Sequence, residues 1–218
     1  MKQSFTVLTA PPPFTPKIRE GLYSHAVTEP LDKTALRVRM RALRRRLAEE
    51  APDAAERAAR RLPLSRFSRF RVVASYRPQG GELDPHPALQ AILGFNPGFA
   101  TPVLPVALDR TSPLRFRHWN LQDKLVPDAF GIPAPPKSAP ELSPNLVIAP
   151  LLAFDRKGGR LGQGAGHYDR TLAKLRKDRP VFMLGLAYAG QEVDELPQDG
   201  HDQRLDAILT ETGYIEVR

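Results

Sequence analysis

Two almost continuous apolar runs constrain the fold of this chain more than any other feature. NLVIAPLLAF occupies residues 145–154, and VFMLGLAY occupies residues 181–188. Such runs are typical of strands buried on both faces of a parallel sheet, and parallel strands need a crossover connection. Between the runs lie a glycine-rich stretch and then Tyr168, Leu172 and Leu175 at helical spacing. We therefore predict a strand, a loop, a helix and a second strand, in that order.

Similar patterns place further elements on both sides of this unit. A helix is predicted from Asp32 to Glu50, with Asp32 or Thr34 as its cap, because apolar residues recur there every three or four positions. Shorter helices are expected over 53–62 and from His86. Strands are expected over 71–76, over 100–108 at a sheet edge or ending early because of its prolines, over 114–119 as an antiparallel strand, and near the C-terminus. The proline-rich residues 127–145 are predicted to form a surface connection.

Strands that alternate with helices predict the fold class. We expect a three-layer α/β/α, Rossmann-like fold with a mostly parallel central sheet. One domain is predicted over residues 31–218. Residues 1–30 contain PPP and show no usable periodicity, so they are predicted to form an irregular arm.

Composition removes several classes of chemistry. The chain of 218 residues has no cysteine, which excludes disulfides, thiolate zinc sites and a cysteine nucleophile. No apolar run is long enough to span a membrane, and no secretory signal is evident, so a cytoplasmic protein is expected. The net charge of +8 favours anionic partners and leaves nucleic acid, phosphorylated ligands and polyglutamates open.

RLGQGAGHYDR, at residues 160–170, is the segment that most directly predicts a binding site. Gly162, Gly164 and Gly166 lack side chains, so successive backbone amides can turn toward one anion at the N-terminus of the following helix. Arg160 and Arg170 can add charged hydrogen bonds. The P-loop and dinucleotide-binding fingerprints are both absent. The spacing alone therefore favours phosphate binding, with a glycine-rich surface turn as the alternative.

The wider segment PLLAFDRKGGRLGQGAGHYDRTLAKL resembles the signature of the 5-formyltetrahydrofolate cyclo-ligases, also called methenyltetrahydrofolate synthetases. Four other segments agree with that family in the same order along the chain. They are KTALRVRMRALRRRL, GGELDPHPAL, VLPVAL with LRFRHW, and LPQDGHDQRLDAILTETG. The resemblance covers about residues 33–212. It implies a fold like that of NagB, RpiA and the CoA transferases.

The resemblance implies an ATP- and Mg²⁺-dependent ligase. In this family the formyl oxygen on N5 of the folate attacks the γ-phosphate of ATP, N10 then attacks the activated carbon, and phosphate leaves. The products are 5,10-methenyltetrahydrofolate, ADP and phosphate. No covalent enzyme residue is expected, so the protein would act by positioning and charge neutralisation. A monomer is expected, with polyglutamylated folates open as substrates.

The resemblance also assigns residues to each ligand. ATP contacts are implied at Lys33, Arg37, Arg160, Leu161, Gly162, Gln163, Gly164, Ala165, Gly166, His167 and Tyr168. Folate contacts are implied at Arg37, Glu82, Gln163, Gly164, Ala165, Gly166 and His167, with Arg77 as a neighbour that cannot be aligned firmly. Magnesium ligands are implied at Asp169 and Asp202. The chain departs from the family at His167, where tyrosine is more usual, and at Ala165, where a larger side chain is frequent.

Each of these residues has a simpler explanation when taken alone. Lys33 and Arg37 can belong to a solvated basic face, and Glu82 can be an exposed loop acid. Asp169 can cap a helix, and Asp202 can be a turn residue. His201 and Trp119 are predicted to be structural, and the other arginines of the first helix (Arg39, Arg41, Arg44, Arg45 and Arg46) are predicted to be solvated.

Two other function classes stay open. Residues 33–61 hold ten Lys or Arg against four Asp or Glu, which suits a nucleic-acid-binding module, although no recognised motif for one is present. A sugar-phosphate isomerase or acyl-CoA transferase can share a similar core. A requirement for ATP separates the ligase from both.

Overall fold

The structure, a computed structural model, describes residues 32–95 and 98–217. The arm predicted at residues 1–30 lies outside the described residues. A seven-stranded sheet runs through the molecule in the order β11-β10-β9-β6-β1-β2-β3. Its strands are β1 (Val72–Ala74), β2 (Thr101–Val106), β3 (Arg115–His118), β6 (Leu146–Pro150), β9 (Phe182–Leu186), β10 (Ala207–Leu209) and β11 (Tyr214–Glu216).

The predicted parallel core of the sheet is confirmed. The five strands β10, β9, β6, β1 and β2 are parallel to one another, and β11 and β3 pair antiparallel with them at the two edges. β6 is the central strand, and its residues 146–149 are fully buried. Two small ribbons lie outside this sheet, β4 (Val126–Pro127) with β5 (Pro133–Ala134), and β7 (Ala153–Phe154) with β8 (Arg160–Leu161).

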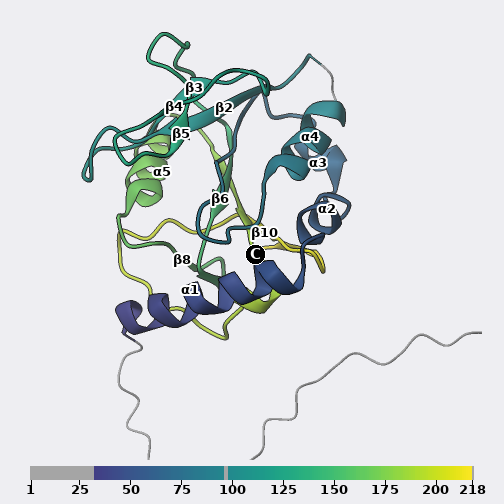
Figure 1. Cartoon of the computed structure of the whole chain (residues 1–218), viewed down its shortest axis with the longest axis vertical. Coiled ribbons are helices and arrows are strands. Elements are labelled where there is room, and N and C mark those ends of the chain that lie inside the picture. Colours follow the sequence, from purple (N-terminus) through teal and green to yellow (C-terminus); the bar gives the residue numbers. More distant parts are fainter. Residues whose placement is uncertain (1–31, 96–97, 218) are drawn as a thin grey trace, which may run out of the picture.

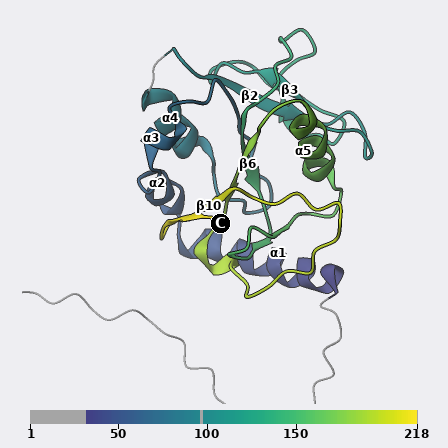
Figure 2. The same cartoon turned by 180° about the vertical axis from the view of Figure 1, so that it is seen from behind.

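Helices cover both faces of the sheet (Figures 1 and 2). They are α1 (Lys33–Glu50), α2 (Ala54–Ala59), α3 (Leu64–Phe67), α4 (His86–Phe95) and α5 (His167–Asp178), with a 3-10 turn η1 (Ala189–Gln191). Ile148 of β6 packs in the cluster that contains α2, α3 and α4, whereas Val147 packs on the other face with Leu172 of α5. Alternate residues of one strand therefore bury against different helical layers, as the pleat requires. None of the helices among the described residues is long and apolar enough to cross a bilayer.

α1 lies across the carboxyl edge of the sheet rather than on either face (Figure 1). Its side chains Leu36 and Met40 pack against Leu152 and Leu161, which belong to the chain that leaves β6. Asp32 caps the helix, because its carboxylate accepts hydrogen bonds from the amides of Thr34 and Ala35. The edge at which ligands bind in open α/β sheets is thus walled by a basic helix.

Two predicted boundaries need correction, and one short helix was missed. The apolar run at 145–154 is not one strand, since β6 ends at Pro150 and β7 turns away to pair with β8. The second helix spans Ala54–Ala59 instead of 53–62, and the short α3 was not predicted. The glycine stretch consequently follows β8, and α5 begins at His167.

The proline-containing strand was predicted to lie at an edge or to end early, and the edge alternative is wrong because β3 lies outside β2. β2 pairs with β1 through residues 101–103 and with β3 through residues 103–106, so its pairing with β1 ends before Pro105. Pro102 precedes the residues that pair with β3 and uses its carbonyl to accept from the amide of Trp119, while Pro105 lies past Val103, the last residue paired with β1.

Candidate active site

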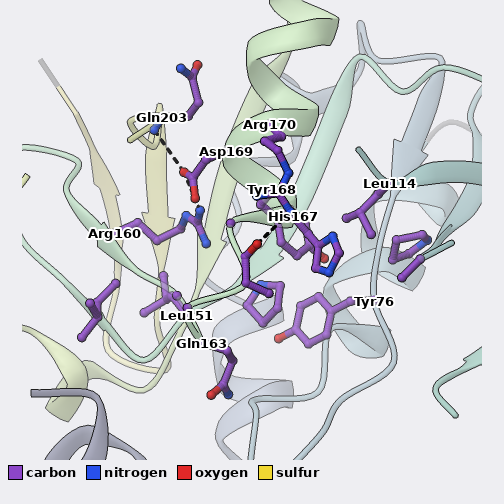
Figure 3. A pocket seen from close by; sticks show the side chains of 18 of the residues that line it. Tyr76, Leu114, Leu151, Arg160, Gln163, His167, Tyr168, Asp169, Arg170 and Gln203 are labelled. Atoms are coloured by element: carbon purple, nitrogen blue, oxygen red, sulfur yellow. Dashed lines mark hydrogen bonds and ion pairs between the residues drawn. The ribbon is translucent and has the colours of Figure 1, made fainter. Parts of the chain in front are cut away.

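A pocket of about 990 Å³ opens between α1, the glycine stretch, α5 and the loops at the carboxyl edge of the sheet (Figure 3). Every residue to which the sequence assigned a ligand contact lines it. These residues are Lys33, Arg37, Glu82, Arg160, Leu161, Gly162, Gln163, Gly164, Ala165, Gly166, His167, Tyr168, Asp169 and Asp202, and Arg77 lines it too. The fold therefore brings segments that are up to 169 residues apart in the sequence to one cavity.

The glycine stretch is held in place through its carbonyl groups. Arg37 donates from Nε to the carbonyl of Gly162 at 3.1 Å, and Arg170 donates to the carbonyl of Ala165 at 2.7 Å. Gly164 and Gly166 have φ values of 108° and 67°, which L side chains rarely adopt, and Gly166 is the N-cap of α5. No described residue accepts a hydrogen bond from the amides of residues 162–166. These amides and the positive end of the α5 dipole are thus available to an anion.

Acidic and basic side chains pair at the end of the pocket nearest the start of α1. Lys33 donates to Asp202 at 2.8 Å and to Asp199 at 3.0 Å. Burial opposes the charge of Lys33, but the two carboxylates hold its pKa above the ordinary value. The hydrogen bond from Lys33 likewise lowers the pKa of Asp199. Lys33 is therefore engaged with carboxylates and does not lie on a freely solvated face.

Asp169 is joined to the same end of the pocket. Its carboxylate accepts from Arg160 at 2.8 Å and from the amide of Gln203 at 3.1 Å, both drawn as dashed lines in Figure 3. The second bond places Asp169 beside the backbone next to Asp202. Asp169 does not cap α5, because the N-cap is Gly166. The capping alternative is thereby removed.

The donor set here fits a magnesium ion that arrives with a nucleotide. Among the described residues, no group of three or more His, Cys, Asp or Glu side chains could hold a metal by itself. Mg²⁺ commonly takes one or two protein carboxylates and completes its six oxygens with substrate phosphates and water. The two carboxylates of Asp169 and Asp202 meet that smaller requirement.

Arg44 is the clearest correction at residue level. It was predicted to be solvated, but it is 2% exposed and forms an ion pair with Glu82 at 3.2 Å. Glu82 is itself not an exposed loop acid, since its side chain is 8% exposed. Burial raises the pKa of Glu82, and the nearby Arg44 charge opposes that rise. Arg44 continues the spacing of Leu36 and Met40 along α1, so the buried stripe itself was a signal that pointed to it.

Arg41 is also not simply solvated. It donates to the side-chain oxygen of Gln163 at 2.9 Å and to the Gln163 carbonyl at 3.1 Å. Together with Arg37, it ties α1 to two consecutive residues of the glycine stretch. Arg39, Arg45 and Arg46 are exposed, as predicted.

The aromatic groups Phe130, His167 and Tyr168 line another part of the pocket. The ring of His167 lies 5.6 Å from that of Phe130, and its Nδ1 is 3.3 Å from the carbonyl of Ser112. The ring of Tyr168 lies beneath Arg160 at 5.7 Å, and burial followed by the charge of Glu82 raises its pKa. Phe130 was missed because it lies in the proline-rich connection, where no periodicity marks it. Trp119 is buried in the core as predicted, whereas His201 is exposed at the pocket rim.

Comparisons with known proteins agree with the family resemblance of the sequence motifs. The family model described as "5-formyltetrahydrofolate cyclo-ligase family" matches residues 30–211. The 5-formyltetrahydrofolate cyclo-ligase of Mycolicibacterium smegmatis is 30% identical over 198 residues, which cover 87% of this chain and 99% of that protein. The enzyme of the same name from Escherichia coli K12 is 34% identical over 146 residues, covering 64% and 77%.

Solved structures are similar over most of the chain. The 5,10-methenyltetrahydrofolate synthetase of Aquifex aeolicus has a TM-score of 0.70 and 28% identity, covering 85% of this chain and 93% of that one. The synthetase from Mycoplasma pneumoniae has a TM-score of 0.64 and 23% identity, covering 83% and 99%, and this likeness concerns the fold alone.

Proposed function

The chain belongs to the 5-formyltetrahydrofolate cyclo-ligase family, and from this we propose that its pocket couples ATP cleavage to closure of the folate ring. The enzyme is a ligase that converts 5-formyltetrahydrofolate to 5,10-methenyltetrahydrofolate. One observation carries the assignment of the site. One cavity is lined by the glycine stretch, whose amides have no acceptor among the described residues, by Lys33 and Arg160 with their carboxylate partners, and by the buried Glu82.

The phosphates of ATP would bind at the glycine stretch. The amides of residues 162–166 would donate to phosphate oxygens, and Lys33, Arg37 and Arg160 would supply positive charge. Asp169 and Asp202 would hold Mg²⁺, which when bound offsets the negative charge of the triphosphate. Lys33 and Arg160 already lie against these carboxylates, so they are close enough to share the phosphate charge.

The folate would lie between Glu82 and the part of the pocket that His167 lines. The Glu82 carboxylate would accept hydrogen bonds from the N–H edge of the pterin, and residues 163–167 would contact its other side. The formyl oxygen on N5 then attacks the γ-phosphorus as ADP leaves. N10 attacks the carbon that bears the phosphorylated oxygen and loses its proton to solvent, and the C–O bond breaks so that phosphate departs with the former formyl oxygen. The chain contributes alignment and charge stabilisation and forms no covalent bond.

The proposal extends to the whole enzyme. Residues 31–218 would act as one catalytic domain, as a monomer in the cytoplasm, on folates with one or several glutamates.

The test is to incubate the purified protein with 5-formyltetrahydrofolate and Mg-ATP. Methenyl product and ADP should appear in equal amounts, and neither should appear when ATP is replaced by a non-hydrolysable analogue. Omission of Mg²⁺ should abolish turnover. A folded protein that makes product without consuming ATP, or that makes none, would contradict the proposal.

A further inference from the structure

Arg44 connects three separate parts of the pocket wall to α1. Its Nη1 donates to the Glu82 carboxylate and to the carbonyl of Leu151, both at 3.2 Å. Its Nη2 donates to the carbonyls of Gln79 at 3.2 Å and Gly80 at 3.1 Å. Gln79 and Gly80 follow β1, and Leu151 follows β6, so one guanidinium joins the carboxyl ends of two neighbouring strands.

The loop around Gly80 and Gly81 fits closely against the backbone of α1. A Cβ added at Gly81 would lie 3.3 Å from the Cα of Arg45 and 3.5 Å from the carbonyl oxygen of Arg44. The φ values of Gly80 and Gly81, 53° and 78°, also favour glycine. These contacts and the four hydrogen bonds from Arg44 fix the position of the residue that follows, Glu82.

The Glu82 side chain has little freedom once Arg44 is in place. Its Oε1 accepts from Arg44, and its Oε2 accepts from the amide of Gln79 at 3.0 Å. Gln163 also stabilises the carboxylate, and Tyr76 and Tyr168 are the other titratable groups close to it. A carboxylate this deeply buried needs a fixed counter-charge, because removal of one partner leaves the other charge uncompensated.

We propose that Arg44 is a positioning residue for the folate: it holds the Glu82 carboxylate charged and oriented toward the substrate. It would act through Glu82 and not on the phosphates, whose proposed site is at Lys33 and Arg160. The planar fork is needed because it serves four acceptors in fixed directions, which an ammonium group cannot reproduce. The inference rests on the proposed function, since it takes Glu82 as a folate contact.

The experiment compares Glu82→Gln, Arg44→Met, the double variant and Arg44→Lys. We expect Glu82→Gln to raise the KM for 5-formyltetrahydrofolate by at least about tenfold while the KM for ATP stays within about twofold, as for a lost charged hydrogen bond. Arg44→Met should raise the folate KM by a similar factor, and the double variant should be no worse than the more affected single variant. Arg44→Lys, which keeps the charge, should fall between Arg44→Met and the native enzyme.

Arg45→Met is the matched control, because Arg45 is the exposed neighbour of Arg44 on α1 and does not line the pocket. Its KM values should equal those of the native enzyme. An unchanged folate KM in Glu82→Gln would remove the folate assignment of Glu82, and with it the proposal. A raised folate KM in Glu82→Gln together with a native folate KM in Arg44→Lys would overturn the role of Arg44 alone. Arg44→Lys therefore keeps the proposal testable even if Arg44→Met does not fold. An equal rise of both KM values in the Arg44 variants would assign Arg44 to the fold only.

Discussion

The carboxylate of Asp202 has neighbours that make it a sensitive test of the metal assignment. It accepts from Lys33 at 2.8 Å and from the amide of Asp199 at 3.0 Å, and its side chain is 27% exposed. We expect Asp202→Ala to lower turnover on the order of 100-fold, because several kcal/mol of charge stabilisation depend on the metal. The cost to folding should be below about 1 kcal/mol, since the ion pair is partly exposed. Turnover measured over a range of Mg²⁺ concentrations checks this.

The control for Asp202→Ala is Asp194→Ala, an exposed acid outside the pocket, which should behave as the native enzyme does. The surviving activity of Asp202→Ala should need more Mg²⁺. A native Mg²⁺ requirement in this variant would show that Asp202 does not hold the metal.

Gly164 tests the backbone cradle. Its φ is 108°, and an added Cβ would lie 3.5 Å from Nε of Arg37, which itself holds the Gly162 carbonyl. Gly164→Val should therefore displace the loop and raise the KM for ATP by about tenfold or more, the loss expected for one charged hydrogen bond. Gly94→Ala in α4 is the control, because a Cβ there meets nothing within 4 Å and should stabilise the helix by about 0.5–1 kcal/mol. Unaltered ATP kinetics in Gly164→Val would argue against the cradle.

For single residues, the sequence predicts which ones belong to the site better than it predicts which partners they contact. Gly162, Gly164 and Gly166 were picked out by spacing, and Lys33 and Asp202 only by family resemblance. No local pattern states that Lys33 meets Asp202, because the contact crosses 169 residues. Arg44 was missed within a run of arginines, although its place on the buried stripe of α1 marks it.

Among the elements, the β7–β8 hairpin depends on one buried acid. Asp155 is 1% exposed and accepts hydrogen bonds from the amides of Lys157, Gly159 and Leu196, at 2.9, 2.8 and 3.0 Å. Asp155→Ala leaves these amides without their acceptor and should lower the free energy of unfolding by about 2–4 kcal/mol. Urea titration of each variant measures this loss. Asp53→Ala, which removes an exposed ion pair with Arg57, should lower the free energy of unfolding by less than about 0.5 kcal/mol. Equal losses for the two variants would contradict this role for Asp155.

Element boundaries were less predictable than element types. The apolar run at 145–154 continues through the sequence without a break, but the chain leaves the sheet after Pro150 because the carbonyls of Leu151 and Leu152 bond to Gln191 and Arg44. The prolines of β2 were read as edge signals, although β3 pairs with β2 on its outer side. Both errors arise from partners distant in sequence, which a local pattern does not contain.

For the molecule as a whole, the alternation of strands and helices was enough to predict a mostly parallel sheet. The order of its strands was not predictable, since β1 pairs with β6 across more than 70 residues. The placement of α1 at the carboxyl edge was equally unpredictable from the sequence. Its apolar stripe is compatible with any buried surface, and only the structure assigns that stripe to Leu152 and Leu161.

The charge of the whole chain predicts how the enzyme responds to salt. The net charge is +8, and seven Lys or Arg side chains line the pocket against five Asp or Glu, so the field attracts ATP before it makes contact. Raising the ionic strength from about 0.05 to about 0.5 M should increase the KM for ATP several-fold, because long-range attraction is screened within about 10 Å. The kcat should change by less than about twofold, since close and partly buried pairs are screened much less.

A double variant, Arg39→Gln with Arg46→Gln, removes two exposed charges outside the pocket and should show a shallower salt dependence with the same KM at high salt. A KM for ATP that is independent of salt would mean that the local contacts at the glycine stretch account for binding without help from the net charge.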